Sequence, residues 1–217
     1  MTSCQSSYWD RVATEKRFSH PLRVDWITHR LSPDARILDC GCGYGRTLAE
    51  LHAAGYHNLT GLDFSEAMLR RCRSEIPDNA VVRNDGQSLP FKTHSVDAVL
   101  LFAVLTCIPH DGEQRALISE VERILRPDGL LYLSDLLVND DQRNRERYDK
   151  YASPGTYGVF ELPEGVVVRH HTVEWINEIT SAFERLEYEP FTVTTMNGNA
   201  SAAFQYLGRK PLQNRAR

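Results

Sequence analysis

A glycine-rich turn in the first quarter of the chain constrains the fold more than any other feature of the sequence. It follows a short apolar run and precedes residues 46–51, which favour a helix. The turn consists of Asp39, Cys40, Gly41, Cys42, Gly43, Tyr44 and Gly45. Alternate glycines permit backbone angles that other residues avoid, and they let a ligand approach the main chain closely. Because the following helix also starts with free N–H groups, the segment predicts a nucleotide-type pocket at the carboxyl end of a strand.

The spacing of the glycines separates two kinds of nucleotide pocket. The turn has the pattern D-x-G-x-G-x-G, whereas dinucleotide-binding folds carry G-x-G-x-x-G. Arg46 stands where that second pattern needs its third glycine. The spacing therefore disfavours an NAD-dependent dehydrogenase.

Further segments follow in an order that is typical of one enzyme family. An apolar run ends at Asp63, eighteen positions after Gly45, close to the spacing at which an acid accepts hydrogen bonds from a ribose. An Asp-Gly pair at 85–86 follows a third predicted strand, and Phe102-Ala103 ends a fourth. A helix and a Pro-Asp-Gly turn at 127–129 come next, where the family usually has Pro-Gly-Gly. Residues 35–138 thus resemble the class I S-adenosylmethionine (SAM) methyltransferases.

The resemblance implies a SAM site on the matching positions. Its residues are Asp39, Gly41, Gly43, Gly45, Arg46, Asp63, Phe64, Asp85, Gly86, Phe102 and Ala103. In the family the first acid orders the loop, the glycines admit the methionine part of SAM, and the acid after the second strand holds the ribose. The next residue and the loop after the third strand contact the adenine, and the end of the fourth strand lies near the sulfonium. Arg46 could bind the SAM carboxylate, although a surface salt bridge would explain it equally well.

Strands that alternate with helices predict a parallel sheet covered by helices on both faces. We expect strands at 36–40, 58–63, 80–83, 96–102 and 130–135, with helices at 44–54, 66–76 and 112–125 between them. The fold class is thus α/β, a Rossmann-like seven-stranded, mostly parallel sheet whose last strand is antiparallel. We expect a single domain over 1–217, with a helical cover at 1–31 whose second helix starts at Pro21, and a SAM-binding core at 35–138.

The pattern changes after the fifth predicted strand. Residues 139–171 form an insert on the substrate side, with a charge-rich solvated helix or loop at 139–150 and a β-hairpin at 157–171. A helix is expected from Thr172 to about Glu184. Strands at 191–196 and 202–207 flank Asn197-Gly198-Asn199, which favours a tight turn and an antiparallel pair. These elements make up the C-terminal part, 172–210.

Composition excludes several classes of protein. The chain has 217 residues, 41% of them apolar, and a net charge of −4, which argues against a nucleic-acid binder. No apolar run is long enough for a membrane span, and the N-terminus lacks a signal-peptide pattern. The five cysteines form neither a disulfide framework nor a zinc pattern. We therefore expect a cytoplasmic protein with no metal and no membrane partner, whose oligomeric state is unknown.

The strongest candidates on the acceptor side are Arg169, His170 and His171, at the end of the predicted hairpin. Side chains alternate along a strand, so Arg169 and His171 share a face opposite His170. One face could offer a base or an anion clamp to a pocket, whereas structural hydrogen bonding is the competing explanation. His110 follows the fourth predicted strand, where family members place acceptor contacts. Tyr8 and Tyr157 are weaker candidates.

Missing motifs narrow the acceptor. The segment after the fourth predicted strand contains no Asn/Asp-Pro-Pro-Tyr/Phe of base-methylating enzymes, no Pro-Cys of cytosine-C5 enzymes and no glutamate pair of protein-arginine enzymes. A small-molecule N-, O- or S-methyltransferase remains. Two alternatives stay open. One is a SAM-dependent enzyme that transfers another group, and the other is a non-catalytic SAM-binding regulatory module.

Overall fold

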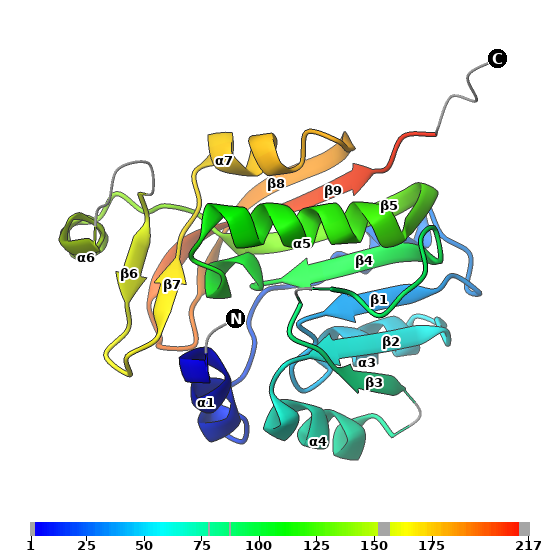
Figure 1. The fold of residues 1–217 in the computed structure, drawn as a ribbon, viewed down its shortest axis with the longest axis horizontal. Helices are drawn as coiled ribbons and strands as arrows, with labels where there is room; N and C mark the ends of the chain where they lie inside the picture. The colour runs from blue at the N-terminus through cyan, green and yellow to red at the C-terminus, as the bar shows by residue number, and fades with distance from the viewer. Residues whose placement is uncertain (1–2, 78, 87, 152–156, 213–217) are drawn as a thin grey trace.

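A mixed seven-stranded sheet forms the centre of the molecule in the computed structural model, which describes residues 3–77, 79–86, 88–151 and 157–212. In their order across the sheet, its strands are β3 (Ala80–Arg83), β2 (Leu59–Asp63), β1 (Ile37–Cys40), β4 (Val96–Phe102), β5 (Leu125–Leu136), β9 (Ala200–Arg209) and β8 (Glu184–Thr194). The first five run parallel, and β9 is antiparallel to both β5 and β8. The predicted fold class is confirmed (Figure 1).

Helices cover both faces of the sheet, as a mostly parallel sheet requires. On one face, α5 (Asp111–Ile124) and α7 (Val173–Ile179) pack in the same apolar cluster as the inner side of β4 and β5. On the other face, α2 (Val24–Thr28), α3 (Arg46–Ala53) and α4 (Glu66–Glu75) contribute to a second cluster. All four residues of β1 are therefore buried, which explains why this strand is short and apolar in the sequence.

Local signals in the sequence set the ends of the helices around the predicted pocket. Ser65 caps α4, because its hydroxyl accepts a hydrogen bond from the Met68 N–H at 3.1 Å. Gly45 takes a left-handed conformation, φ +84°, immediately before α3, and Gly55 at φ +92° follows that helix. Both helices therefore start at the carboxyl ends of strands, within one or two residues of the predicted positions.

The N-terminal segment differs from the helical cover predicted at 1–31. Helix α1 covers Ser3–Val12, and α2 begins at Val24 rather than at Pro21. The stretch between them is not helical because its backbone groups bond to the sheet instead. Gln205 donates to the Pro21 carbonyl at 2.6 Å, and the Arg23 N–H donates to the Tyr132 hydroxyl at 3.0 Å. A non-helical segment, residues 13–23, therefore joins the two helices and is called the strap below.

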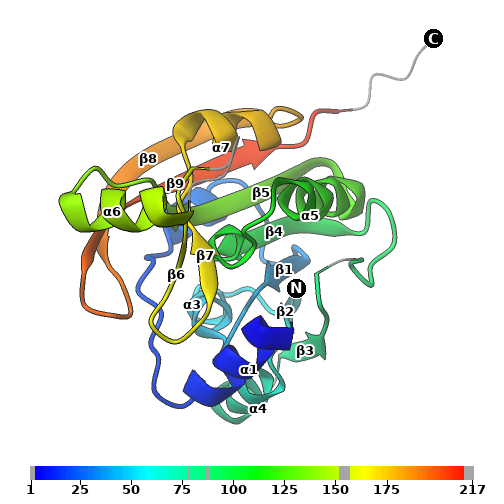
Figure 2. The ribbon, with the colours of Figure 1, turned by 60° about the vertical axis from the view of Figure 1, so that its left-hand side comes forward.

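The insert after β5 contains the predicted hairpin, β6 (Val159–Glu161) paired antiparallel with β7 (Val167–Arg169). The charged segment before it forms α6 (Gln142–Tyr151), whose Asn144 and Tyr148 are fully buried. Tyr8 on α1 packs in one apolar cluster with Tyr148, Phe160 and Val168. In Figures 1 and 2, α1 and the hairpin lie together at the end of the sheet where the parallel strands terminate.

The C-terminal pair of strands is longer than predicted. Helix α7 ends at Ile179 instead of near Glu184, and β8 already starts at Glu184. Arg209 on β9 pairs with the Glu184 carboxylate at 2.8 Å, and this ion pair favours the extended register. The predicted antiparallel pairing is confirmed. Its turn projects toward the same end of the sheet, where Thr195 and Asn197 line a cavity.

Candidate active site

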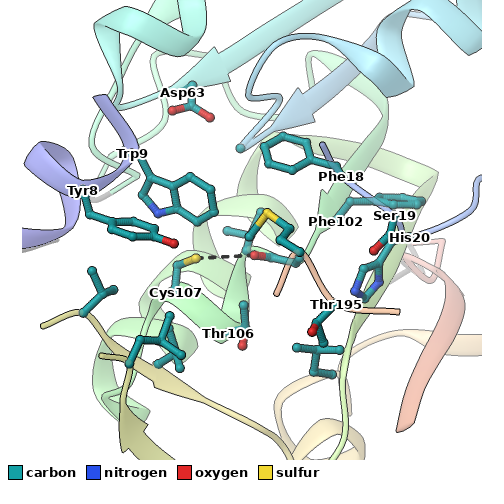
Figure 3. A pocket seen from close by; sticks show the side chains of 18 of the residues that line it. Tyr8, Trp9, Phe18, Ser19, His20, Asp63, Phe102, Thr106, Cys107 and Thr195 are labelled. Atoms are coloured by element: carbon teal, nitrogen blue, oxygen red, sulfur yellow. Dashed lines mark hydrogen bonds between the residues drawn. The ribbon is translucent and has the colours of Figure 1, made fainter. Parts of the chain in front are cut away.

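A large cavity opens at the carboxyl ends of β1, β2 and β4. Helix α1, the strap that follows it, α6, the β6–β7 hairpin and the β8–β9 turn also contribute to its wall. Figure 3 shows Tyr8, Trp9 and Cys107 on one side of the cavity, and His20 and Thr195 on the other. Most of the lining side chains are apolar or aromatic, so the cavity suits a ligand with a large apolar surface.

The glycine turn forms part of the cavity wall with its main chain. Gly41, Gly43 and Gly45 have φ values of +83°, +53° and +84°, which L side chains rarely adopt. Gly41 and Gly43 line the cavity, and a Cβ atom at Gly43 would overlap the ring of Phe18. Gly45 does not line the cavity; a Cβ there would meet Cys72 and Ile76 of the α4 region. Its glycine is therefore needed for packing and for starting α3.

Asp63 lies in the cavity wall at the end of β2. Its carboxylate accepts hydrogen bonds from the backbone N–H groups of Gly43 at 2.9 Å and Ser65 at 2.8 Å. Burial raises the pKa of Asp63 to about 6, although these N–H groups and that of Phe64 act in the opposite direction. A carboxylate offers about four acceptor positions, so room remains for a hydroxyl donor. The site thus fits a ribose.

The loops after β2 and β3 complete this side of the cavity. Phe64, Asn84 and Gly86 line it, and the Gly86 N–H donates to the Asn84 side chain at 2.8 Å. Asp85 is exposed and its side chain does not line the cavity. Of the predicted adenine contacts, the structure therefore brings Phe64 and Gly86 to the cavity wall.

Asp39 and Arg46 support the turn from different sides. Asp39 is fully buried beneath the cavity, where it accepts a hydrogen bond from the Thr47 hydroxyl, and burial raises its pKa to about 6. Arg46 lines the cavity, pairs with Glu50 and donates to the His20 carbonyl. The bond from Arg46 to His20 ties the strap to the start of α3. The loop-ordering role of Asp39 stays a prediction.

The end of β4 brings a strained residue to the cavity. Phe102 and Ala103 both line it, and Ala103 has φ +54°, which is uncommon for a residue with a Cβ atom. The Cys107 thiol bonds to the Ala103 carbonyl at 3.6 Å (Figure 3). Burial raises the pKa of Cys107 far above its ordinary value, so this thiol stays protonated and is not a nucleophile.

The hairpin residues divide between the cavity and the framework. His170 lines the cavity, whereas Arg169 and His171, on the opposite face, do not. Arg169 is buried, forms an ion pair with Asp111, and its guanidinium lies 4.7 Å from the Trp175 ring centroid. The structure therefore separates the three residues as strand alternation predicts, and Arg169 has a structural partner.

His171 belongs to a buried polar network. Its Nε2 lies 2.9 Å from the Gln114 side-chain nitrogen, and its Nδ1 lies 3.2 Å from the Leu136 carbonyl. Burial lowers the pKa of His171 to about 3, so the ring is neutral. His110 is exposed at the start of α5 and does not line the cavity. The structure brings neither histidine to the cavity wall.

His170 is held in one orientation by α6. Its Nδ1 lies 2.6 Å from the Tyr148 hydroxyl and 3.4 Å from the Asn139 side-chain nitrogen. Burial is the largest cause that lowers the pKa of His170 to about 3. Tyr8 also lines the cavity, whereas Tyr157 packs on the Tyr148 ring with centroids 5.3 Å apart.

The structure adds a histidine that no sequence motif identifies. His20, on the strap, is buried and lines the cavity, and its Nδ1 lies 2.9 Å from the Ser134 hydroxyl. Burial lowers its pKa to about 4, so the ring is neutral near pH 7. Ser134 is fully buried at the end of β5, next to Phe102 of β4 in the sheet. His20 is therefore fixed near the position where the sulfonium of SAM is expected.

The comparisons with known proteins agree with this geometry. Residues 38–133 match a family model described as a methyltransferase domain. The segment carries the glycine turn, Asp63 and the end of β4. Residues 38–133 are therefore similar to the methyltransferase-domain family.

Proteins similar to this chain include a phthiotriol/phenolphthiotriol dimycocerosates methyltransferase of Mycobacterium ulcerans. It is 36% identical over 120 residues, which are 52% of this chain and 42% of that protein. The chain thus spans less than half the length of that relative. A ubiquinone biosynthesis O-methyltransferase of Dechloromonas aromatica is 27% identical over 93% of this chain and 86% of its own.

A crystal structure of a SAM-dependent methyltransferase from Methanosarcina mazei superposes with a TM-score of 0.81. It is 26% identical, and the match covers 89% of this chain and 100% of that chain. Among the described residues of the present domain, no group of histidine, cysteine and acidic side chains is suited to a metal ion. No helix within the same residues has the length and apolarity that crossing a membrane requires.

Proposed function

We propose that the protein binds SAM in this cavity and transfers its methyl group to a nitrogen, oxygen or sulfur atom of a small molecule. The observation that carries the proposal is the position of Asp63. Its buried carboxylate joins the glycine turn to the β2 loop and faces the same cavity as Phe102 and His20. A cofactor site and an apolar acceptor site therefore share one enclosure.

SAM would supply a methyl group that is already activated by its sulfonium. The remaining task of the chain is to hold donor and acceptor in line, which can contribute several kcal/mol to lowering the barrier. Asp63 would accept hydrogen bonds from the ribose, and Phe64 with Gly86 would contact the adenine. Tyr8 and Trp9 of α1 and Phe18 of the strap would exclude water from the reacting atoms.

On the acceptor side, His20 is the side chain best placed to take a proton. Its ring is neutral, buried in the cavity wall and oriented by Ser134. If Nδ1–H donates to the Ser134 hydroxyl, Nε2 presents a lone pair, as a general base requires. The two named relatives act on lipids or on ubiquinone precursors, and this supports an acceptor with an apolar body and a hydroxyl group.

Calorimetric titration with SAM and with S-adenosylhomocysteine tests the cofactor part of the proposal. We expect micromolar affinity for both, about −8 kcal/mol of binding free energy. Incubation with methyl-labelled SAM and a panel of apolar phenols, amines and thiols then tests transfer. Absence of binding for both cofactor forms would contradict the proposed site. Binding without transfer to any panel member would contradict the proposed acceptor class.

A further inference from the structure

Two arginines on one side of α6 line the part of the cavity that is bounded by the hairpin. Arg143 and Arg147 are four residues apart, so their side chains emerge from neighbouring positions on the helix surface. Arg145 lies between them in sequence, is exposed and does not line the cavity. The helix therefore directs two of its three neighbouring arginines toward the ligand space.

Neither cavity arginine has a carboxylate partner among the described residues. The buried Arg169 forms an ion pair with Asp111. None of the ion pairs among the described residues involves Arg143 or Arg147. Glu146, next to Arg147 in sequence, accepts a hydrogen bond from Gln142 at 2.8 Å. Asp141, whose charge raises the pKa of Arg147, already bonds to the backbone and side chain of Asn144. These two guanidinium groups thus bring positive charge to the cavity without an ion-paired counter-charge.

Arg147 is partly withdrawn from water as well. Its guanidinium carbon lies 3.5 Å from the centroid of the Phe160 ring, and its Nε atom is buried with no hydrogen-bond partner among the described residues. Burial lowers the pKa of Arg147. Burying a charge without an ion-pair partner is costly, and a bound anion would offset that cost.

The hairpin next to the two arginines contributes apolar side chains. Leu162, Val166 and Val168 of the hairpin region line the same part of the cavity. His170 also lines the cavity, and the charges of Arg147 and Arg143 contribute to its lowered pKa. His170 is therefore neutral and does not compete as a cation. A ligand that fits this wall has an apolar body and one anionic group.

We propose that the methyl acceptor is an amphiphile whose carboxylate or phosphate is bound by Arg143 and Arg147, with its apolar body along the hairpin. This inference rests on the function proposed above. Arginine suits the task because its planar fork can donate two parallel hydrogen bonds to either anion. SAM's own carboxylate is expected at the glycine turn, near Arg46, on a different element of the cavity wall.

Fluorescence titration with parinaric acid and with its neutral methyl ester tests the proposal without knowledge of the natural acceptor. We expect the wild-type protein to bind the acid more tightly than the ester. The double variant Arg143→Gln/Arg147→Gln should lose about tenfold or more in affinity for the acid and little for the ester. Arg145→Gln, the matched control on the same helix, should bind both probes as the wild type does.

Two further variants test whether a loss of affinity in the double variant comes from misfolding instead of from the loss of positive charge. Arg147→Lys keeps the charge and most of the stem over Phe160, so it should retain part of the preference for the acid. Arg143→Gln alone changes an exposed side chain and should lower affinity for the acid only. Equal wild-type affinity for acid and ester, failure to bind the acid, or an equal loss in Arg145→Gln would overturn the proposal.

Competition identifies the anion and separates this inference from the function on which it rests. Laurate, dodecyl phosphate and dodecanol would be added to the parinaric acid complex, and the better of the two anionic competitors marks the preferred group. Displacement by dodecanol as strong as that by either anion would contradict the arginine subsite. Titration of the same variants with SAM should give wild-type affinity. Failure of the wild-type protein to bind SAM would refute the proposed function. The probe titrations would still show whether Arg143 and Arg147 bind an anionic group.

Discussion

The two halves of the cavity are built in different ways. The half near β1 and β2 consists mainly of main chain, with glycines at positive φ and backbone N–H groups that bond to Asp63. The other half, which is lined by α6, the hairpin and the strap, consists of side chains from segments far apart in the sequence. His20 and Ser134, for example, are 114 positions apart.

This difference teaches which properties of the protein can change independently. The main-chain half depends on a few consecutive residues after each strand, so almost any substitution there disturbs the framework. The side-chain half depends on residues whose backbones are fixed elsewhere. Acceptor preference should therefore change through substitutions on α6, the strap and the hairpin while SAM affinity stays constant.

Substitution of Asp63 is the most severe way to break the cofactor half. Asp63→Ala removes the acceptor of the ribose hydroxyls and should weaken SAM binding by about a hundredfold or more, because hydrogen bonds to a charged group are worth about 1.5–3 kcal/mol each. Calorimetry measures this loss. Affinity for parinaric acid should not change.

Two variants serve as controls for that experiment. Asp34→Ala alters an exposed acid away from the cavity and should bind SAM normally. Asp63→Asn keeps an acceptor oxygen for the backbone N–H groups, which guards against misfolding. Unchanged SAM affinity in a folded Asp63→Ala protein would disprove the ribose assignment.

On the acceptor half, His20→Ala should lower kcat by about a hundredfold, the lower end of the range for loss of a general base. The KM for SAM should stay the same, because the ring lies outside the expected nucleoside site. Steady-state assays with labelled SAM measure both. His110→Ala is the control, since His110 is exposed and lies off the cavity. A KM change without a kcat change would instead indicate a binding role for His20.

Substitution of His171 tests whether a buried residue behind the cavity wall affects stability without affecting ligand binding. His171→Phe should reduce the free energy of unfolding by about 2 kcal/mol, because the side chain of Gln114 and the carbonyl of Leu136 lose a buried partner. Urea denaturation measures this change. SAM affinity and preference for parinaric acid should be those of the wild type. A stable variant with altered probe preference would place His171 in the site after all.

The smallest expected effect is a pH dependence confined to the cofactor half. Asp63 has a pKa of about 6, raised by burial, and its ionised form is the better hydrogen-bond acceptor. SAM affinity should therefore be constant above pH 7 and fall by about tenfold as pH decreases from 7 to 5. Calorimetry across this range checks the sign, and the Asp63→Asn variant should show no such fall. A rise in affinity at low pH would contradict the assignment.

The contrast between the halves also explains what the sequence could predict. Gly41, Gly43 and Asp63 follow strands at fixed spacings, so the pattern alone brings them to one cavity edge. The alternation of side chains along a strand predicted that His170 lies opposite Arg169 and His171. It did not indicate which face of the strand enters the cavity. Asp111 and Gln114 of α5 decide that, since they bind Arg169 and His171.

The remaining differences have a similar physical origin. His20 has no local signal, because only the folded sheet brings Ser134 beside it. The strap around it was predicted to be helical from its apolar residues, but its hydrogen bonds to Tyr132 and Gln205 hold it in a non-helical conformation. Tertiary partners thus override local propensity where the strap meets the sheet.

The position of Trp9 gives the protein an optical reporter of its own. The indole lines the cavity, with its ring centroid 5.2 Å from that of Tyr8 and 6.0 Å from that of Phe18. Trp26 and Trp175 are buried in the two apolar clusters on either face of the sheet. Emission changes on ligand addition therefore originate mainly from one indole. Stopped-flow mixing can follow the arrival of each ligand in real time, without any added dye.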